Sequence, residues 1–105
     1  MKRSFAKLLA GRIGAQACTT VKGVEVDLAL NSDACEVKLY PAKFHSGFDQ
    51  ALALKHVAGF ESVCLLHIVK SLGDGYLEGI TKLCRATGIS VLVYSEVSGV
   101  HVFRG

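Results

Sequence analysis

The near-continuous apolar run Val63-Cys64-Leu65-Leu66-His67-Ile68-Val69 constrains the fold more than any other segment. Successive side chains of a strand point to opposite sides, so apolar residues at both odd and even positions require cover on both faces. Residues 61–70 are therefore predicted to form a strand that lies within a sheet and is covered on both sides. His67, inside this run, is expected to be a hydrogen-bonded core or edge histidine rather than a base.

The rest of the chain alternates helical and strand patterns around this run. Apolar residues recur at helical spacing in residues 3–16 and 46–58, and a third helix is expected from Asp74 to Gly88. Ser46 and Asp74 are expected to cap the second and third helices. The expected strands are residues 17–21, 24–30, 35–40, 61–70, 89–94 and 99–104. The order α(β)ββαβαββ predicts an α/β fold in which a mixed β-sheet is flanked by helices.

Length and composition limit the class of protein. At 105 residues, 1–105 is predicted to be a single domain, because cores split only beyond about 250 residues. An apolar content of 50% excludes a disordered chain. No uncharged apolar run approaches the roughly 18 residues of a membrane-spanning helix. Lys7 and Arg12 interrupt the apolar part of the first segment, so we interpret it as an amphipathic helix rather than a secretory signal, and expect an intracellular (cytoplasmic) protein.

Charge is distributed unevenly along the chain. The formal net charge is +3, and residues 1–24 contain five basic residues and no acid. Such a face suits a partner that carries phosphates, although a solvated helix face fits equally well. The four cysteines show no CxxC spacing, so a zinc site is not expected. The candidate phosphate contacts in this region are Lys2, Arg3, Lys7, Arg12 and Lys22.

The hairpin around Asn31-Ser32-Asp33 brings charged residues together. If the aliphatic residues of both strands share one buried face, Asp27, Glu36 and Lys38 must share the other, because a one-residue slip would separate the aliphatic sets. Opposed side chains then lie about 5 Å apart and diagonal ones about 7–8 Å apart. The register that we predict places Leu30 opposite Cys35, Leu28 opposite Val37, and Asp27 opposite Lys38.

Two carboxylates this close repel each other unless a cation lies between them. Hard oxygen ligands in small number favour Mg²⁺ or Mn²⁺, and the backbone carbonyl of Val37 is a further candidate ligand beside Asp27 and Glu36. Lys38 is then placed to activate a water molecule or to stabilise transition-state charge. The alternative is a surface hairpin with a cross-strand Asp–Lys pair, which stabilises a sheet by less than about 1 kcal/mol.

The segment Val24-Glu25-Val26-Asp27, followed after eight residues by Glu36-Val37-Lys38, resembles the PD-(D/E)xK motif of the restriction-endonuclease-like nuclease superfamily. The leading helix, the two strands and the helix that follows are similar to the family's order, over roughly residues 3–70. The resemblance implies Mg²⁺-dependent hydrolysis of DNA phosphodiesters, with Asp27 and Glu36 as metal ligands and Lys38 as the water-activating or charge-stabilising residue. Val26 stands where the family motif has Pro.

Two further positions bear on the resemblance. Gln50 matches the Gln of a QxxxY sub-motif that supports the site in several branches, although Leu54 stands in place of Tyr. Holliday-junction resolvases of this superfamily carry an acid on the first helix. Residues 2–16 contain none, so Glu25 is the alternative second acid.

We therefore expect a Mg²⁺-dependent DNA endonuclease, more structure-selective than sequence-specific, without a small-molecule cofactor or a membrane partner. A chain this short lacks a separate DNA-recognition domain, so a homodimer is expected. Lys43 and His45 border the proposed site as further phosphate contacts. One alternative is a catalytically silent nucleic-acid-binding or assembly module with the same fold. A second is an unrelated α/β domain that binds protein.

Overall fold

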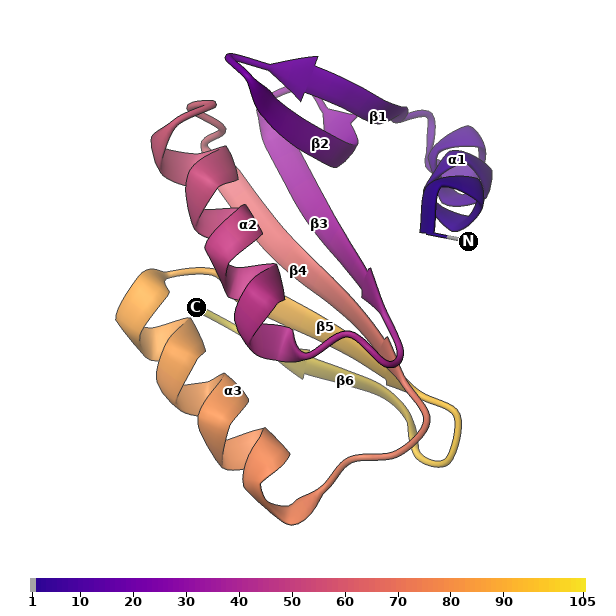
Figure 1. Cartoon of the computed structure of the whole chain (residues 1–105), viewed down its shortest axis with the longest axis vertical. Helices are drawn as coiled ribbons and strands as arrows, with labels where there is room; N and C mark the ends of the chain where they lie inside the picture. The colour runs from indigo at the N-terminus through magenta and orange to yellow at the C-terminus, as the bar shows by residue number, and fades with distance from the viewer. Residues whose placement is uncertain (1) are drawn as a thin grey trace.

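Six strands form one mixed sheet, which three helices flank, in a computed structural model that describes residues 2–105 (Figure 1). The strands lie in the sheet in chain order; β3, β4 and β5 run parallel, and the other neighbours run antiparallel. The predicted α/β class and the mixed sheet with flanking helices are confirmed. The elements are α1 (Lys2–Ile13), β1 (Gln16–Val21), β2 (Val24–Leu30), β3 (Asp33–Leu39), α2 (Phe44–His56), β4 (Ser62–Val69), α3 (Asp74–Thr87), β5 (Ser90–Ser95) and β6 (Gly99–Phe103).

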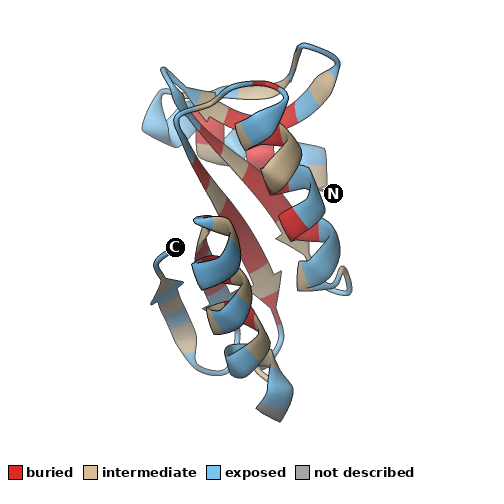
Figure 2. Ribbon diagram, turned by 90° about the vertical axis from the view of Figure 1, so that its left-hand side faces the viewer, coloured by how far each residue is buried: buried red, intermediate tan, exposed pale blue. Residues whose placement is uncertain are grey.

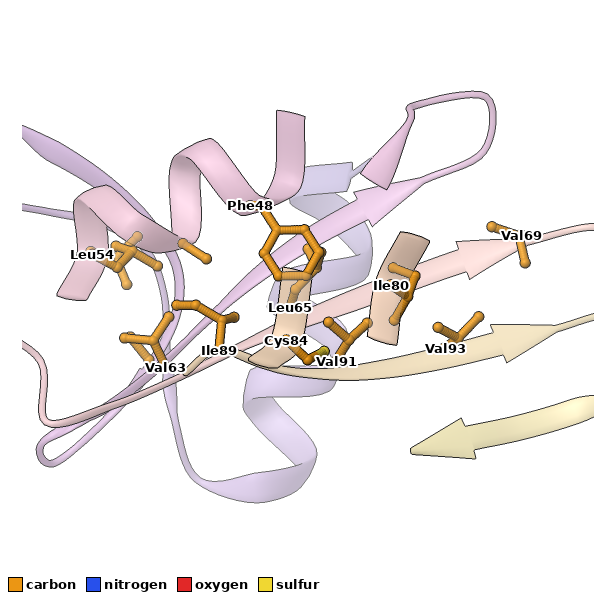
Figure 3. Close-up of a cluster of buried hydrophobic side chains, with 13 residues drawn as sticks. Phe48, Leu54, Val63, Leu65, Val69, Ile80, Cys84, Ile89, Val91 and Val93 are labelled. Atoms are coloured by element: carbon orange, nitrogen blue, oxygen red, sulfur yellow. The ribbon is translucent and has the colours of Figure 1, made fainter. Parts of the chain in front are cut away.

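The apolar run that predicted a doubly covered strand is β4. Val63, Leu65 and Val69 pack into the larger core, which α2 and α3 cover, as Figure 3 shows. Leu66 packs into the smaller core under α1, with Ile68 beside it. Burying each such side chain stabilises the fold by about 1.5–3 kcal/mol. The helices on both faces of the sheet therefore contribute to the stability of the fold.

The two faces of the sheet are covered unequally. The helices α2 and α3 are the crossovers from β3 to β4 and from β4 to β5, and both pack on one face. On the other face α1 packs on β1, β2 and β3 alone. The outer side of β5 and β6 therefore has no helix over it. Figure 2, which looks onto the side of α2 and α3, shows β6 beside α3 as an edge strand of exposed and half-buried residues. The exposed side chains of the outer side are Leu92, Tyr94, Val100 and Val102.

The expected helix caps differ from those in the structure. The N-cap of α2 is Lys43, not Ser46, whose hydroxyl lies inside the first turn and donates to the Lys43 carbonyl. The N-cap of α3 is Gly73 rather than Asp74. Both helices therefore start earlier than expected, and neither N-cap residue makes a side-chain capping hydrogen bond. Gly88 ends α3 in the left-handed conformation, with φ of 74°, as expected.

The predicted register of the β2–β3 hairpin is wrong by two residues. Instead of Leu30 opposite Cys35 and Leu28 opposite Val37, the structure pairs Leu28 with Cys35 and Leu30 with Asp33. Asn31 takes a φ of 55°, and this left-handed residue closes a tight two-residue turn. A shift of two residues keeps every side chain on its original face, so the apolar pattern alone does not distinguish the two registers.

The expectation that the aliphatic residues of β2 share one face is also wrong. Val24 and Val26 pack into the larger core, whereas Leu28 packs into the core under α1. Both faces are covered at this point, so aliphatic residues on either side find a core. Within residues 2–105, no helix combines the length and apolar character needed to cross a membrane.

Candidate active site

Asp27 lies where regular strand pairing is interrupted on both sides. Its neighbour across β1, Cys18, has a φ of 55°, and the β1–β2 register omits this pair. On the other side, the β2–β3 ladder extends only as far as Leu28 and Cys35. Figure 1 shows the β1–β2 pair turning away from the remaining strands. The change of face between Val26 and Leu28 follows from this bulge, which turns the Asp27 side chain toward β3.

The Asp27 carboxylate replaces the strand pairing that is lost. Its Oδ2 accepts a hydrogen bond of 2.8 Å from the backbone N–H of Val37, so the amide between Glu36 and Lys38 is fixed by a β2 side chain. Asp27 and Glu36 also contact each other through their carboxyl groups. Both side chains are buried, with residue exposures of 8% and 2%.

A cation from α1 bridges the two acids. Lys2 Nζ lies 3.1 Å from Asp27 Oδ2 and 3.6 Å from Glu36 Oε1. Lys2 was predicted to contact phosphates, but its ammonium group is directed at the carboxylates. The signal was present in the sequence, because Lys2 precedes the buried Ala6 by four residues and so lies on the helix face toward the sheet. The helical pattern places Lys2 on the inner face of α1, but which groups it contacts depends on how α1 packs on β1–β3.

Burial and mutual repulsion separate the proton affinities of the two acids. Desolvation, followed by the hydrogen bond and the negative charge of Asp27, raises the pKa of Glu36 from 4.5 to about 8. Desolvation also acts on Asp27, but hydrogen bonds from Glu36, Val37 and Lys2 outweigh it and lower the pKa of Asp27. At neutral pH, without an additional cation, Asp27 is ionised and Glu36 holds a proton.

Lys38 lies on the same face of β3 as Glu36, toward α2, and not opposite Asp27 as the predicted register required. Its positive charge acts to lower the pKa of Glu36. The helix α2 comes close to it at Gly47: a Cβ there would lie 3.2 Å from Lys38 Cγ and 2.6 Å from Leu65 Cδ1. The glycine thus allows the helix to pack against the aliphatic part of the Lys38 side chain.

Two other candidates lie apart from the pair or at its edge. Gln50 is exposed on α2, and within residues 2–105 the hydrogen bonds and ion pairs of the two carboxylates involve Val37, Lys2 and one another. The structure therefore does not bring Gln50 into the cluster. Glu25 is exposed and lines, with Arg3, Lys2 and Asp27, a hollow of about 290 Å³, which Glu36 does not line.

The remaining basic candidates fall into separate groups. Arg3, Lys7 and Arg12 are exposed along α1. Lys22 is in the β1–β2 turn, with its Nζ near the Gly59 loop. Lys43 and His45 are exposed at the start of α2, near the carboxyl end of β3.

His67 is buried, and both of its ring nitrogens are hydrogen-bonded, as predicted for a core histidine. Its Nε2 lies 2.8 Å from the Ala42 carbonyl, and its Nδ1 contacts the Tyr76 hydroxyl. Desolvation lowers the pKa of His67 and raises that of Tyr76 to about 12, so both are neutral at pH 7. The contact of Tyr76 with His67 could not be predicted from the sequence, because it depends on how α3 packs against β4.

The donor set fits a hard divalent cation. Asp27 and Glu36 are buried oxygen donors that already gather around an ammonium group, and the Val37 carbonyl belongs to the peptide segment that Asp27 fixes. No third Asp, Glu, His or Cys joins them within the described residues. Another hollow, of about 630 Å³, lies by the β2–β3 turn and the end of α2, and none of its lining residues is charged. Comparison with family models, curated proteins and solved structures finds no match, so an assignment of function depends on this site.

Proposed function

We propose that the chain is a Mg²⁺-dependent nuclease with a restriction-endonuclease-like fold, acting on DNA. The observation that carries the proposal is the pair Asp27 and Glu36. Two buried carboxyl groups on adjacent strands contact each other around one cationic group, and a hydrogen bond from Val37 fixes one of them. Burying two acids together destabilises a fold, so such a pair is more often retained for chemistry than for stability.

Each residue has a separate role in this proposal. Asp27, Glu36 and the Val37 carbonyl would hold Mg²⁺ or Mn²⁺, which when bound lowers the pKa of water and neutralises phosphate charge. Lys38 offers an ammonium group on the Glu36 side, where it can stabilise the charge that develops on the phosphate or position the attacking water. The break in pairing at Asp27 leaves this side of β2 open to a substrate strand.

The substrate would be held mainly through its backbone. Arg3 and Lys7 are exposed four residues apart on α1, whose first turn reaches the carboxylates, and Arg12 is exposed further round the same helix. Contacts of this kind recognise charge and shape rather than sequence. We therefore propose structure-selective cleavage, as at branched or partly single-stranded DNA.

Cutting both strands of a duplex or a junction requires two copies of the site. We propose a homodimer formed through the outer face of β5 and β6, where α1 leaves the sheet uncovered. Four apolar side chains are exposed there in two facing pairs, Leu92 with Val102 and Tyr94 with Val100. A contiguous exposed apolar patch of this kind is typical of a protein–protein interface.

The position of Lys2 supports a second candidate function. Its ammonium group already lies between the two acids, so the cluster also fits a structural ion triad in a catalytically silent nucleic-acid-binding module. In that case DNA binding would depend on salt, through the basic helix, but not on a divalent cation.

Cleavage assays distinguish the two functions. Labelled linear duplex, single strand, flap and four-way junction DNA are incubated at low salt with Mg²⁺, Mn²⁺ or EDTA. The wild type is compared with Glu36→Gln and Lys38→Ala, and with Glu61→Gln, which alters an exposed carboxylate outside the site. Circular dichroism checks that each variant is folded.

We expect metal-dependent cutting that falls at least about 100-fold in Glu36→Gln and Lys38→Ala and is unchanged in Glu61→Gln. If every folded protein binds DNA and leaves all four substrates intact in each metal, the nuclease proposal is wrong and the silent module is favoured. If none binds DNA, both candidate functions are wrong.

A further inference from the structure

A hollow of about 260 Å³ lies where β3 and β4 end and α2 and α3 begin, the end of the sheet at which these connections gather in Figure 1. We call it the aromatic pocket and define it by Tyr40, Phe44, His67 and Tyr76, with Lys43 and Lys70 at its edge. None of its lining residues takes part in the carboxylate cluster, so the pocket is a separate feature of the molecule.

The walls of the aromatic pocket are rings that pack against each other. Phe44 meets Tyr76 edge to face, with centroids 5.2 Å apart, and Tyr76 stacks on His67 at 5.6 Å. Gly79 of α3 allows this approach, since a Cβ there would lie 3.0 Å from the Phe44 ring. Tyr40 is 56% exposed, so its ring remains accessible to an occupant.

The polar side chains at the floor of the pocket are already paired. The Ala42 carbonyl can only accept, so His67 Nε2 carries the proton and Nδ1 accepts from the Tyr76 hydroxyl. Both side chains are therefore committed to partners within the protein. The rings of Tyr40, Phe44 and Tyr76 form the apolar part of the lining, and of these three Tyr40 is exposed.

The rim of the pocket is cationic. Lys43 and Lys70 are exposed, and Lys70 Nζ lies 4.8 Å from the centroid of the Tyr40 ring. None of the residues that line the pocket is acidic. An aromatic surface with ammonium groups beside it complements a flat ring that is attached to phosphates, which is the chemistry of a nucleic-acid strand.

The pocket adjoins the candidate active site through the sheet. His67 of the floor is the direct neighbour of Lys38 in the β3–β4 register, and the Lys38 charge acts on the pKa of His67. A DNA strand with a phosphate at Lys38 would therefore also pass close to the mouth of the aromatic pocket.

We propose that the aromatic pocket receives one unpaired nucleobase of the substrate, next to the phosphate that is cleaved. This inference rests on the proposed function and narrows its substrate class to strands with an unpaired nucleotide beside the cut. A base within a duplex is stacked on both sides and cannot enter. The volume, slightly below the ~300 Å³ of the smallest ordinary ligand pockets, accommodates one base.

The test measures binding of fluorescent DNA in EDTA, so that cleavage plays no part. The probes are a single strand of thymidines, the same strand with abasic residues throughout, a blunt duplex, and single strands of adenine or cytosine. The variants are Tyr40→Ala, Tyr40→Leu, which keeps apolar bulk without a ring, and Tyr40→Phe, which keeps the ring. Tyr40 is exposed, so these variants are expected to fold.

We expect the wild type to bind the thymidine strand about 5- to 100-fold more tightly than the abasic strand. Tyr40→Ala and Tyr40→Leu should lose this preference, and Tyr40→Phe should keep it. The strands of different bases should bind within a few-fold of one another. Equal binding of the thymidine and abasic strands by the wild type, or a preference that persists in Tyr40→Leu, would overturn the inference.

The binding test in EDTA and the cleavage assay can fail separately. If the protein prefers strands with bases but cuts no substrate, base binding in the aromatic pocket is supported and the nuclease proposal is refuted. If the protein cuts DNA in a metal-dependent way but shows no base preference, the nuclease proposal is supported and the aromatic pocket has no part in substrate binding.

Discussion

Glu36 and Asp27 differ in protonation because the sheet places them together and buries them. The unfolded chain releases the Glu36 proton near pH 4.5, whereas the folded protein retains it to about pH 8. Between these values the native state binds one more proton than the unfolded state, so raising the pH favours unfolding. The lowered pKa of His67 acts in the opposite sense, but only below its ordinary value of 6.5.

The metal-free protein should therefore lose stability between pH 6.5 and 8, by about 1–2 kcal/mol for one proton. Urea unfolding in EDTA at several pH values measures this change. Glu36→Gln removes the titrating group, so its stability should be nearly constant over the same interval. An equally steep loss in Glu36→Gln would show that another group is responsible.

Lys2 competes with any metal ion for the two carboxylates. An ion pair that is 36% exposed on the lysine side contributes up to about 1 kcal/mol, so removing it should tighten Mg²⁺ binding up to about fivefold. We expect this effect in Lys2→Met, together with lower stability in EDTA. Isothermal titration of Mg²⁺ measures the affinity, and Lys7→Met, an exposed lysine of the same helix, is the matched control. Unchanged affinity in Lys2→Met would mean that Mg²⁺ does not bind between these acids.

At the scale of elements, α2 packs tightly against β3 and β4 at Gly47. Leu65 is fully buried, so its side chain has little room to move away from an added methyl group. The helix can accommodate a larger residue only by shifting away from the sheet. Such a shift would also move the aliphatic part of Lys38.

Gly47→Ala should destabilise the fold by about 1–3 kcal/mol through overpacking, offset by up to about 1 kcal/mol of improved helix propensity. It should also reduce cleavage, since Lys38 is displaced. Gly75→Ala is the control, because a Cβ at Gly75 of α3 meets no atom within 4 Å. Thermal unfolding and the cleavage assay measure the two effects. A Gly47→Ala protein as stable and as active as Gly75→Ala would contradict the packing argument.

Periodicity in the sequence was enough to predict most elements but not how they meet. The alternation of apolar and polar residues predicted the bounds of β2, and the apolar run predicted that β4 is covered on both faces. The register of β2 against β3 was wrong because two registers keep the same faces, and the left-handed Asn31 decided between them. The approach of Asp27 to Glu36 was predictable from their shared hairpin. The contacts of Lys2 and Tyr76 were not, because they depend on how α1 and α3 pack on distant strands. The catalytic roles of these residues stay predictions.

For the whole molecule, the uneven cover of the sheet leaves the outer face of β5 and β6 exposed. If this face is the dimer interface, a charge placed at its centre must be desolvated on association. Leu92→Lys should therefore convert the dimer to a monomer at micromolar concentration, as measured by sedimentation. Leu8→Lys, which changes an exposed leucine on α1, should leave the dimer intact. A wild type that sediments as a monomer at about 100 μM would refute this interface.

The strand order of the sheet equals the order of the chain. During synthesis, each strand that leaves the ribosome can therefore add to an edge that is already present, without waiting for a later segment to be inserted. The acids and Lys2 lie within the first 36 residues, whereas Tyr76 completes the aromatic pocket much later. A nascent chain can thus assemble the carboxylate cluster before it has the pocket that we propose for the substrate base.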